Sequence, residues 1–333
     1  MAPHPQRLTV THRAWALTRP VTTAYGVETK ADVVVAEISD VESRGRGEAV
    51  PLRRYGETME SVVAALEAIK GAITSGLNRD TLQSALPPGA ARNALDCAFW
   101  DMDAKRAYQS VAELVGLSTV TPVVTAFTLD FDTPDRMAQQ AAANRTRPWL
   151  KLEFFGDGDI ERVRAVRQAA PTVRLIVDAN ETWNEAQLRE FMPTLSDLRI
   201  ELIEQPLPAD ADDVLAQLEL PIPLCADESC RTLADLERLD GKYQAINIKL
   251  DKVGGLTEAL ALAAEAKRRG LRIMVGGRIS ASLGIAPALL VAQQAHIVDL
   301  DGPLHLAVDR GARLRYDGST IHPPDPKLWG GPT

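Results

Sequence analysis

The spacing of apolar positions changes twice along this chain. From residue 8 to about residue 50 apolar and polar residues alternate, and ADVVVAEIS at 31–39 is the clearest strand, with Gly45 and Gly47 predicted to form a turn after it. From Met59 apolar residues recur at steps of three and four through ESVVAALEAIKGAI, and ARNALDCAFWDMDAKRA has the same spacing. Residues 1–113 are therefore predicted to form a small α+β domain.

After this region the chain becomes a series of short, continuously apolar runs, each followed by an amphipathic segment. Between residues 121 and 302 the eight runs are TPVVTAFT, WLKLEFF, VRLIVDAN, RIELIEQP, IPLCADES, QAINIKLD, LRIMVGGR and AHIVDLDG. Segments such as DIERVRAVRQAA and TEALALAAEAKRRG are predicted helices, and this alternation indicates a parallel sheet covered by helices. Eight units favour a (β/α)₈ barrel over residues 114–310, with 311–333 packing back on the first domain.

A doubly wound open sheet is the structural alternative to a barrel. No GxGxxG follows the first of these strands, so the sequence gives a dinucleotide-binding fold no support. The composition is that of an ordinary globular protein, with 45% hydrophobic and 25% charged residues. The net charge of -8, without any run of Lys or Arg, argues against nucleic acid and anionic membranes as partners.

The cysteines and the apolar tracts bear on where the protein acts. Cys97, Cys225 and Cys230 cannot all pair and form no CxxC, which favours reduced, buried thiols in a cytoplasmic protein. The start, MAPHPQRLTV, lacks the apolar core of a signal peptide. The longest apolar tract, 283–292, is too short to cross a bilayer and is predicted to be a buried helix.

Charged residues mark the ends of five successive apolar runs. Lys151, Asp178, Glu204, Asp227 and Lys249 follow one another at intervals of 22 to 27 residues. A barrel repeats one strand and one helix at about this interval, so the five side chains are predicted to lie side by side at the C-terminal ends of the strands. Barrel active sites are found at that end.

The three carboxylates in the middle of this series indicate a metal site. Asp178, Glu204 and Asp227 would repel one another strongly in one chamber, and a divalent cation removes that cost. Oxygen ligands favour Mg²⁺ first and Mn²⁺ next, and no HExxH or Cys/His cluster points to zinc. A helix cap or a loop salt bridge is the alternative for any single acidic strand end. Three such ends in consecutive units, between two lysines, favour the metal site.

The order Lys, Asp, Glu, Asp, Lys on successive strands resembles that of the enolase superfamily, in its muconate-lactonizing subgroup. VDANETW, IEQPL, ADES and INIK are similar to segments of that subgroup, and GEAVPLRRYGET (47–58) and NALDCAFWDMDAK (93–105) to its capping domain. DLDGPL (299–304) is similar to the Asp-x-Asp segment of its dipeptide epimerases. The resemblance covers nearly the whole chain and implies a modified barrel with an N-terminal capping domain.

This resemblance implies a reaction in which a proton is removed from carbon next to a carboxylate. Asp178, Glu204 and Asp227 would hold the Mg²⁺ that stabilises the resulting enolate. Lys249 is the implied base. A lysine must be neutral to act as a base, and the positive charges of the ion and of Lys151 are expected to lower its pKa.

A second acid/base group is expected on the opposite face of the substrate, and here the sequence departs from the family. The family supplies the second lysine of a Lys-x-Lys pair, whereas this chain has Lys151 and Glu153, which strand alternation directs the same way. Glu153 could be a differently tuned acid/base. It could pair with Lys151 or join the metal ligands, leaving Lys249 as sole base and favouring a lyase or cycloisomerase. The protein could also be a catalytically impaired relative.

Two acidic residues after the eighth run suggest the substrate. In the dipeptide epimerases the Asp-x-Asp segment contacts the free amino end of the substrate, so Asp299 and Asp301 imply a dipeptide or a related amino-acid-derived carboxylate. The alternative for these residues is a loop turn that closes the eighth strand. Related enzymes are often oligomeric, and a homo-oligomer is an expectation of the resemblance alone.

Two further positions bear on specificity. Related enzymes often carry an arginine for a side-chain carboxylate in the loop matching 19–30, where this chain has Tyr25, which argues against an acidic second residue unless Lys30 or Arg19 compensates. Arg278 ends the seventh run after two glycines and could meet an anionic group, with a surface salt bridge as the alternative. We therefore expect a Mg²⁺-dependent isomerase that epimerises a dipeptide of the Ala-Glu type. The alternatives are a one-base lyase or cycloisomerase and a catalytically silent, ligand-binding barrel.

Overall fold

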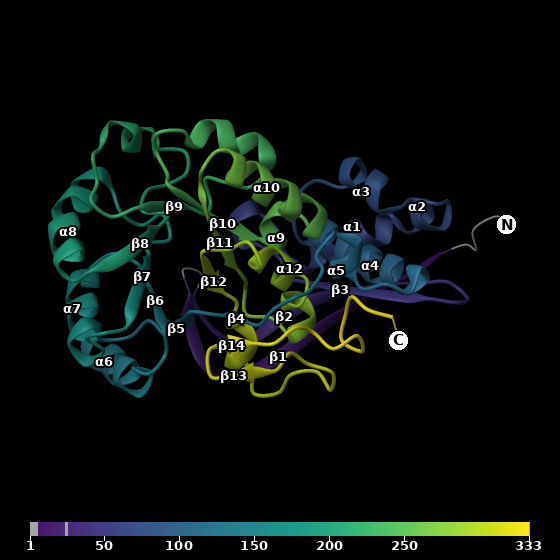
Figure 1. Cartoon of the computed structure of the whole chain (residues 1–333), viewed down its shortest axis with the longest axis horizontal. Helices are drawn as coiled ribbons and strands as arrows, with labels where there is room; N and C mark the ends of the chain where they lie inside the picture. The colour runs from purple at the N-terminus through teal and green to yellow at the C-terminus, as the bar shows by residue number, and fades with distance from the viewer. Residues whose placement is uncertain (1–5, 24–25, 333) are drawn as a thin grey trace.

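Eight parallel strands, hydrogen-bonded in chain order, curl into a nearly closed barrel (Figure 1). The computed structural model describes residues 6–23 and 26–332. The barrel strands are β5 (Phe127–Leu129), β6 (Trp149–Glu153), β7 (Arg174–Asp178), β8 (Ile200–Glu204), β9 (Leu224–Ala226), β10 (Ala245–Lys249), β11 (Arg272–Gly276) and β12 (Ile297–Asp299). The Ala126 amide donates to the Val298 carbonyl at 2.7 Å, which joins the first strand to the last. The predicted barrel is confirmed in all eight apolar runs, and the open sheet is excluded.

Helices follow the strands and cover the outside of the barrel (Figure 1). They are α6 (Pro134–Ala143), α7 (Asp159–Ala169), α8 (Glu185–Asp197), α9 (Leu250–Val253), α10 (Leu256–Arg268), α11 (Ser282–Ile285) and α12 (Ala288–Ala292), with 3₁₀ helices η2 (Asp213–Gln217), η3 (Leu233–Leu239) and η4 (Gly302–His305). The tract 283–292 is buried as predicted but is not one helix. Pro287, which has no amide hydrogen to donate, stands between α11 and α12.

The N-terminal domain combines an antiparallel sheet with a group of helices. The sheet has the order β1 (Arg7–Thr23), β2 (Gly26–Ser39), β3 (Arg44–Ala49), and the helices are η1 (Arg53–Tyr55), α1 (Met59–Ala68), α2 (Lys70–Thr74), α3 (Arg79–Ala85), α4 (Ala90–Ala107) and α5 (Val111–Leu114). Thr58 begins α1 as part of a capping box with Ser61. Leu66, Ile73 and Leu95 lie fully buried between these helices and the sheet.

The prediction of a turn at Gly45 and Gly47 is wrong, because both residues lie inside β3. A Cβ atom at Gly45 would lie 2.0 Å from the Ala98 carbonyl oxygen, and one at Gly47 would lie 2.1 Å from that of Ala94. The two glycines therefore let the strand lie directly against α4, and close backbone approach rather than chain reversal explains them.

The long β1–β2 hairpin and the C-terminal segment both connect the two parts of the molecule (Figure 1). The Ala307 amide donates to the Ala16 carbonyl at 2.8 Å, which fixes the hairpin to the loop after β12. Near the C-terminus, Trp329 Nε1 donates to the Cys97 carbonyl at 3.0 Å. A small third sheet has the order β13 (Tyr316–Asp317), β14 (Thr320–Ile321), β4 (Val123–Val124). In the part of the chain that the structure describes, none of the helices combines the length and apolar character needed to cross a membrane.

Candidate active site

The alternation of side chains along the strands arranges the barrel interior in layers. The lowest layer is a buried apolar cluster with one residue from each strand or the position just before it: Ala126, Trp149, Ile176, Leu202, Cys225, Ala245, Met274 and Ile297. Residues two positions further on point the same way in a strand. The next layer is polar except for Gly276 and consists of Thr128, Lys151, Asp178, Glu204, Asp227, Asn247, Gly276 and Asp299. This stacking explains why the charged residues meet at the C-terminal end of the barrel.

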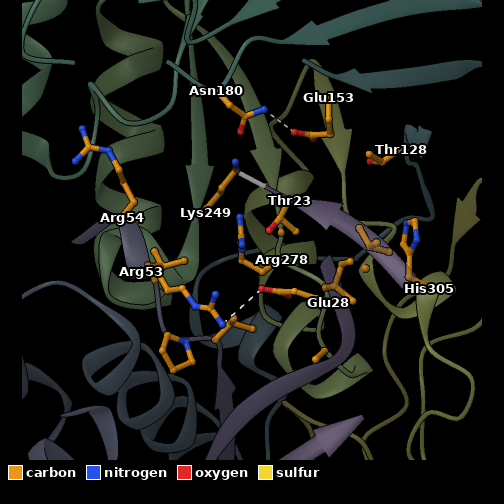
Figure 2. A pocket seen from close by; sticks show the side chains of 18 of the residues that line it. Thr23, Glu28, Arg53, Arg54, Thr128, Glu153, Asn180, Lys249, Arg278 and His305 are labelled. Atoms are coloured by element: carbon orange, nitrogen blue, oxygen red, sulfur yellow. Dashed lines mark hydrogen bonds and ion pairs between the residues drawn. The ribbon is translucent and has the colours of Figure 1, made fainter. Parts of the chain in front are cut away.

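Above these layers lies a cavity of about 830 Å³, enclosed by the barrel mouth, the β1–β2 hairpin and the loop after β3. Five of the catalytic and metal-binding candidates line it, namely Lys151, Glu153, Asp178, Asp227 and Lys249. Glu204 is fully buried directly beneath. Figure 2 shows Glu153 and Lys249 reaching into this cavity from β6 and β10. The structure thus brings the predicted charged residues of successive strands into one place.

Lys151 lies at the centre of the carboxylates. Its Nζ is 2.9 Å from Asp178 Oδ2, 2.9 Å from Glu204 Oε2 and 3.1 Å from Asp299 Oδ2. Burial alone lowers the pKa of Lys151, but these carboxylates outweigh it and raise that pKa well above its ordinary value. Lys151 is therefore a positively charged residue that holds the polar layer together.

Lys249 contacts the other side of the same group. Its Nζ lies 2.6 Å from Asp227 Oδ2 and 3.4 Å from Glu204 Oε1. Burial lowers the pKa of Lys249, but the nearby carboxylates of Asp227 and Glu204 outweigh it, so the pKa of Lys249 is raised well above its ordinary value. Lys252, which the sequence analysis missed, places its Nζ 2.6 Å from Asp227 Oδ1. Lys252 could have been found in the sequence from its position three residues after Lys249, which places it on the short helix α9 directly after the strand.

Lysines stand among the three predicted metal ligands in this structure. Among the described residues, no group of three or more His, Cys, Asp or Glu side chains converges as it would around a metal ion. The contacts of Lys151 and Lys249 explain this, because their ammonium groups neutralise the carboxylates. The metal-dependent lowering of the Lys249 pKa stays a prediction.

The chemistry of these carboxylates nevertheless fits a hard divalent cation. Asp178 is paired in register with Glu204, which is paired with Cys225, and Asp227 lies two residues further along. Glu204 Oε2 is buried and makes no well-directed hydrogen bond. Three buried carboxylates on adjacent strands supply only oxygen ligands, which suit Mg²⁺.

Glu153 is held in place by two neighbours. Its Oε1 lies 3.4 Å from Lys151 Nζ, and its Oε2 accepts a hydrogen bond of 2.7 Å from Asn180 Nδ2 (Figure 2). The side chain is 23% exposed, so the carboxylate still faces the cavity. Asn180 has φ +49° and also donates its amide to Asp178 Oδ1 at 3.0 Å. Sequence reasoning missed Asn180, which lies in the turn after β7, two residues beyond Asp178.

Glu153 and Lys249 lie on opposite sides of the barrel mouth. Their strands, β6 and β10, are separated by β7, β8 and β9 in the order of the eight strands. Strands four positions apart in a closed eight-stranded barrel face each other across its axis. A substrate bound between them would have one titratable group on each face.

Asp299, the last residue of β12, and Asp301, just after it, line the same cavity. Asp299 contacts Lys151, and burial together with Asp301 raises the pKa of Asp299 to about 6 against the opposing effect of Lys151. Asp301 Oδ2 accepts from the Thr128 amide at 2.7 Å and lies 3.3 Å from His305 Nε2. Burial lowers the pKa of His305, but Asp301 raises it further, so the net shift is upward. His305 was not foreseen from sequence.

The remaining specificity candidates differ in what they contact. Tyr25 lies outside the described residues. Arg19 forms an ion pair with Asp130, and Lys30 Nζ lies 3.0 Å from Asp32 Oδ2. Arg278 lines the same cavity as Lys249 (Figure 2).

Glu228 and Tyr55 also line the cavity and were not predicted. Burial and the neighbouring Asp227 raise the pKa of Glu228 to about 8. Nothing marks Tyr55 in the sequence as a cavity residue, because its position depends on how the loop after β3 folds over the barrel.

Comparisons with known proteins agree with this architecture. Residues 6–116 match the family "Mandelate racemase / muconate lactonizing enzyme, N-terminal domain", and residues 135–327 match "Enolase C-terminal domain-like". The L-Ala-D/L-Glu epimerase of Escherichia coli (strain K12) is 44% identical over 315 residues, which cover 94% of this chain and 98% of that protein. An N-acetyl-D-glutamate racemase of Pseudoalteromonas sp is 43% identical over 301 residues, covering 90% and 95%.

Solved structures give the same result. An enolase family member from Agrobacterium tumefaciens with homology to dipeptide epimerases, bound to sodium and L-Ala-L-Glu, is 48% identical with a TM-score of 0.95, covering 98% of this chain and 100% of that chain. A dipeptide epimerase from Enterococcus faecalis V583, complexed with Mg and L-Leu-L-Tyr, is 27% identical with a TM-score of 0.90, covering 99% of each chain. The chain thus belongs to the enolase superfamily, with the two domains of its mandelate racemase and muconate lactonizing group.

Proposed function

We propose that the protein is a Mg²⁺-dependent epimerase of dipeptides, which inverts a carbon next to a carboxylate by removing and returning its proton. The observation that carries this proposal is the position of Lys249 and Glu153 on opposite sides of one cavity, with three buried carboxylates between their strands. The relatives support it, because two of the most similar are named as an epimerase and a racemase of glutamate-containing compounds.

The residues of the cavity have distinct roles in this reaction. Asp178, Glu204 and Asp227 would hold the Mg²⁺, which supplies the positive charge that stabilises an enolate. Lys249, as the neutral amine, takes the α-proton from one face. Glu153, as the carboxylic acid, returns a proton to the opposite face, and the roles reverse for the other epimer.

Two further residues position these groups. Asn180 donates to Glu153 at 2.7 Å and thereby orients its carboxyl group toward the cavity. Lys151 remains charged and keeps the buried carboxylates close together. Asp299 and Asp301 present negative charge near the cavity wall, which suits the ammonium end of a dipeptide.

A one-base lyase or cycloisomerase on a carboxylate substrate is the second candidate function. The observation that favours it is the engagement of both Glu153 oxygens, one with Asn180 and one with Lys151. In that case Lys249 would be the sole base. The group on the opposite face would then be structural.

Exchange of the α-proton with solvent distinguishes these functions. L-Ala-L-Glu and L-Ala-D-Glu are incubated separately in D₂O with Mg²⁺ and the protein, and the α-proton signal is followed by NMR. Exchange from both epimers is the expected result, and Lys249→Ala serves as the control that abolishes it. Exchange from one epimer alone favours the one-base alternative. No exchange across a panel of dipeptides contradicts the proposal and favours a catalytically silent barrel.

A further inference from the structure

Arg278 is placed in the cavity by unusually close packing around the end of β11. It stands two residues after Gly276, in the same alternation that brings Lys249 two residues after Asn247. A Cβ atom at Gly276 would lie 2.7 Å from Asn247 Oδ1 and 3.0 Å from Lys249 Cε. A side chain at Gly276 would displace Asn247 or Lys249, so glycine lets the end of β11 lie directly against β10, and Arg278 follows two residues later.

The backbone of Arg278 is also fixed from its other side. A Cβ atom at Gly302 would lie 2.4 Å from the Arg278 carbonyl oxygen, and the preceding Gly277 donates its amide to the Asp299 carbonyl at 2.9 Å. The position of the backbone is therefore set by β12 and the loop that follows it. The guanidinium group extends from this support into the cavity, as Figure 2 shows.

The guanidinium group of Arg278 has no direct partner among the described residues, and its charge acts only at longer range on the carboxyl group of Asp251. Within residues 6–23 and 26–332, the Arg278 side chain makes no hydrogen bond and no ion pair, including with Asp251. The other lysines and arginines that line the cavity each have an acidic neighbour: Lys30, Arg53, Arg54, Lys151, Lys249 and Lys252. A guanidinium group in a partly enclosed cavity attracts an anion strongly, and its planar fork of donors matches a carboxylate.

We propose that Arg278 binds a second carboxylate of the substrate, at the end of the side chain on the reacting carbon. This inference rests on the proposed function and narrows its substrates to dianionic compounds, in which one carboxylate lies next to the reacting carbon and another lies at the side-chain end. Tyr25 had argued against an acidic second residue in the substrate, and a carboxylate bound by Arg278 reverses that expectation. Arg19 and Lys30 do not replace Arg278 in this role, because Asp130 and Asp32 already pair with them.

Matched substrates and variants test the assignment. L-Ala-L-Glu is compared with L-Ala-L-Gln, which has nearly the same shape without the charge, on the wild type and on Arg278→Met, Arg278→Lys and Lys30→Met. We expect the wild type to favour the glutamate dipeptide in kcat/KM by about ten- to a hundred-fold. Arg278→Met should remove this preference mainly through a higher KM for L-Ala-L-Glu. Arg278→Lys should recover part of it, and Lys30→Met should retain it.

A binding measurement keeps the inference separate from the proposed function. Calorimetric titration of N-acetyl-L-glutamate and N-acetyl-L-glutamine in Mg²⁺ buffer requires no turnover. The expected result is tighter binding of the glutamate compound by the wild type and equal binding of both by Arg278→Met. An unchanged preference in Arg278→Met, or its loss in Lys30→Met instead, overturns the inference. A wild type that binds with this preference but exchanges no α-proton contradicts the proposed function alone.

Discussion

Replacing Asp251 with asparagine should change how the stability of the protein depends on pH. Asp251 lies in the first turn of α9, and its Oδ1 accepts from the Val50 amide at 2.9 Å and from Asn93 Nδ2 at 2.8 Å, so it connects the barrel to the capping domain. Burial raises the pKa of Asp251 from 3.8 to about 7, against the opposing effect of those two hydrogen bonds. The folded protein therefore binds this proton more tightly than the unfolded chain does.

The sign and size of the effect follow from this difference. Stability is greatest while Asp251 is protonated in both states, falls as the pH rises above 3.8, and stops falling above about pH 7. The difference between the two pKa values of Asp251, 3.8 and about 7, corresponds to a loss of about 4 kcal/mol in the free energy of unfolding. Between pH 5 and pH 8 only the part of this loss above pH 5 is measured, about 3 kcal/mol, and because Asp251 is not fully buried we expect about 2 kcal/mol. Asparagine cannot ionise and removes this loss.

Urea unfolding of the wild type and of Asp251→Asn at both pH values measures the effect. The stability of the variant relative to the wild type should increase by about 2 kcal/mol on going from pH 5 to pH 8. Asp197→Asn, the same substitution at an exposed position in α8, should show no such change. A relative stability of Asp251→Asn that stays constant with pH would refute the reasoning.

Three further predictions concern catalysis, packing and closure of the cavity. Glu153→Lys should raise the rate of epimerisation measured by polarimetry, because it restores a lysine opposite Lys249; lower turnover would count against the proposed role of this position. Gly47→Ala should destabilise the protein by about 3 kcal/mol or more in thermal unfolding, because its Cβ atom would lie 2.1 Å from the Ala94 carbonyl oxygen. Gly71→Ala, which has open space around it, should not be destabilised in this way, and equal melting temperatures of the two variants would contradict the packing argument. Arg54→Met removes the ion pair with Glu181 that joins the loop after β3 to the barrel. It should raise KM about threefold or more and change the free energy of unfolding by less than about 1 kcal/mol, and an unchanged KM would exclude a role of this ion pair in holding the loop over the cavity.

The parts of the fold that the sequence predicted are those set by periodicity. All eight apolar runs form barrel strands, because continuously apolar strands are stable where both faces of a parallel sheet are covered, and eight such units close into a barrel. Gly45 and Gly47 were misinterpreted because a glycine required by close packing looks the same in sequence as one required by a turn. The break in the helix at Pro287 was not predicted, because the apolar character of the tract shows that it is buried but not that it forms one continuous helix.

The candidate site was predictable where it follows strand alternation. Lys151, Asp178 and Glu204 come together because each lies two residues beyond an apolar layer. Asn180 was missed because its hydrogen bond to Glu153 joins β6 to the turn after β7 and leaves no local pattern in the sequence. His305 was missed although Asp301 is only four residues away, because a single histidine does not show which acidic residue it contacts.

The most direct test of this account is a crystal structure of the protein grown with Mg²⁺ and L-Ala-L-Glu. We expect one ion at about 2.1 Å from oxygens of Asp178, Glu204 and Asp227. Lys249 and Glu153 should then lie on opposite faces of the α-carbon. An ion bound elsewhere, or a dipeptide with both groups on one side, would contradict the central claim.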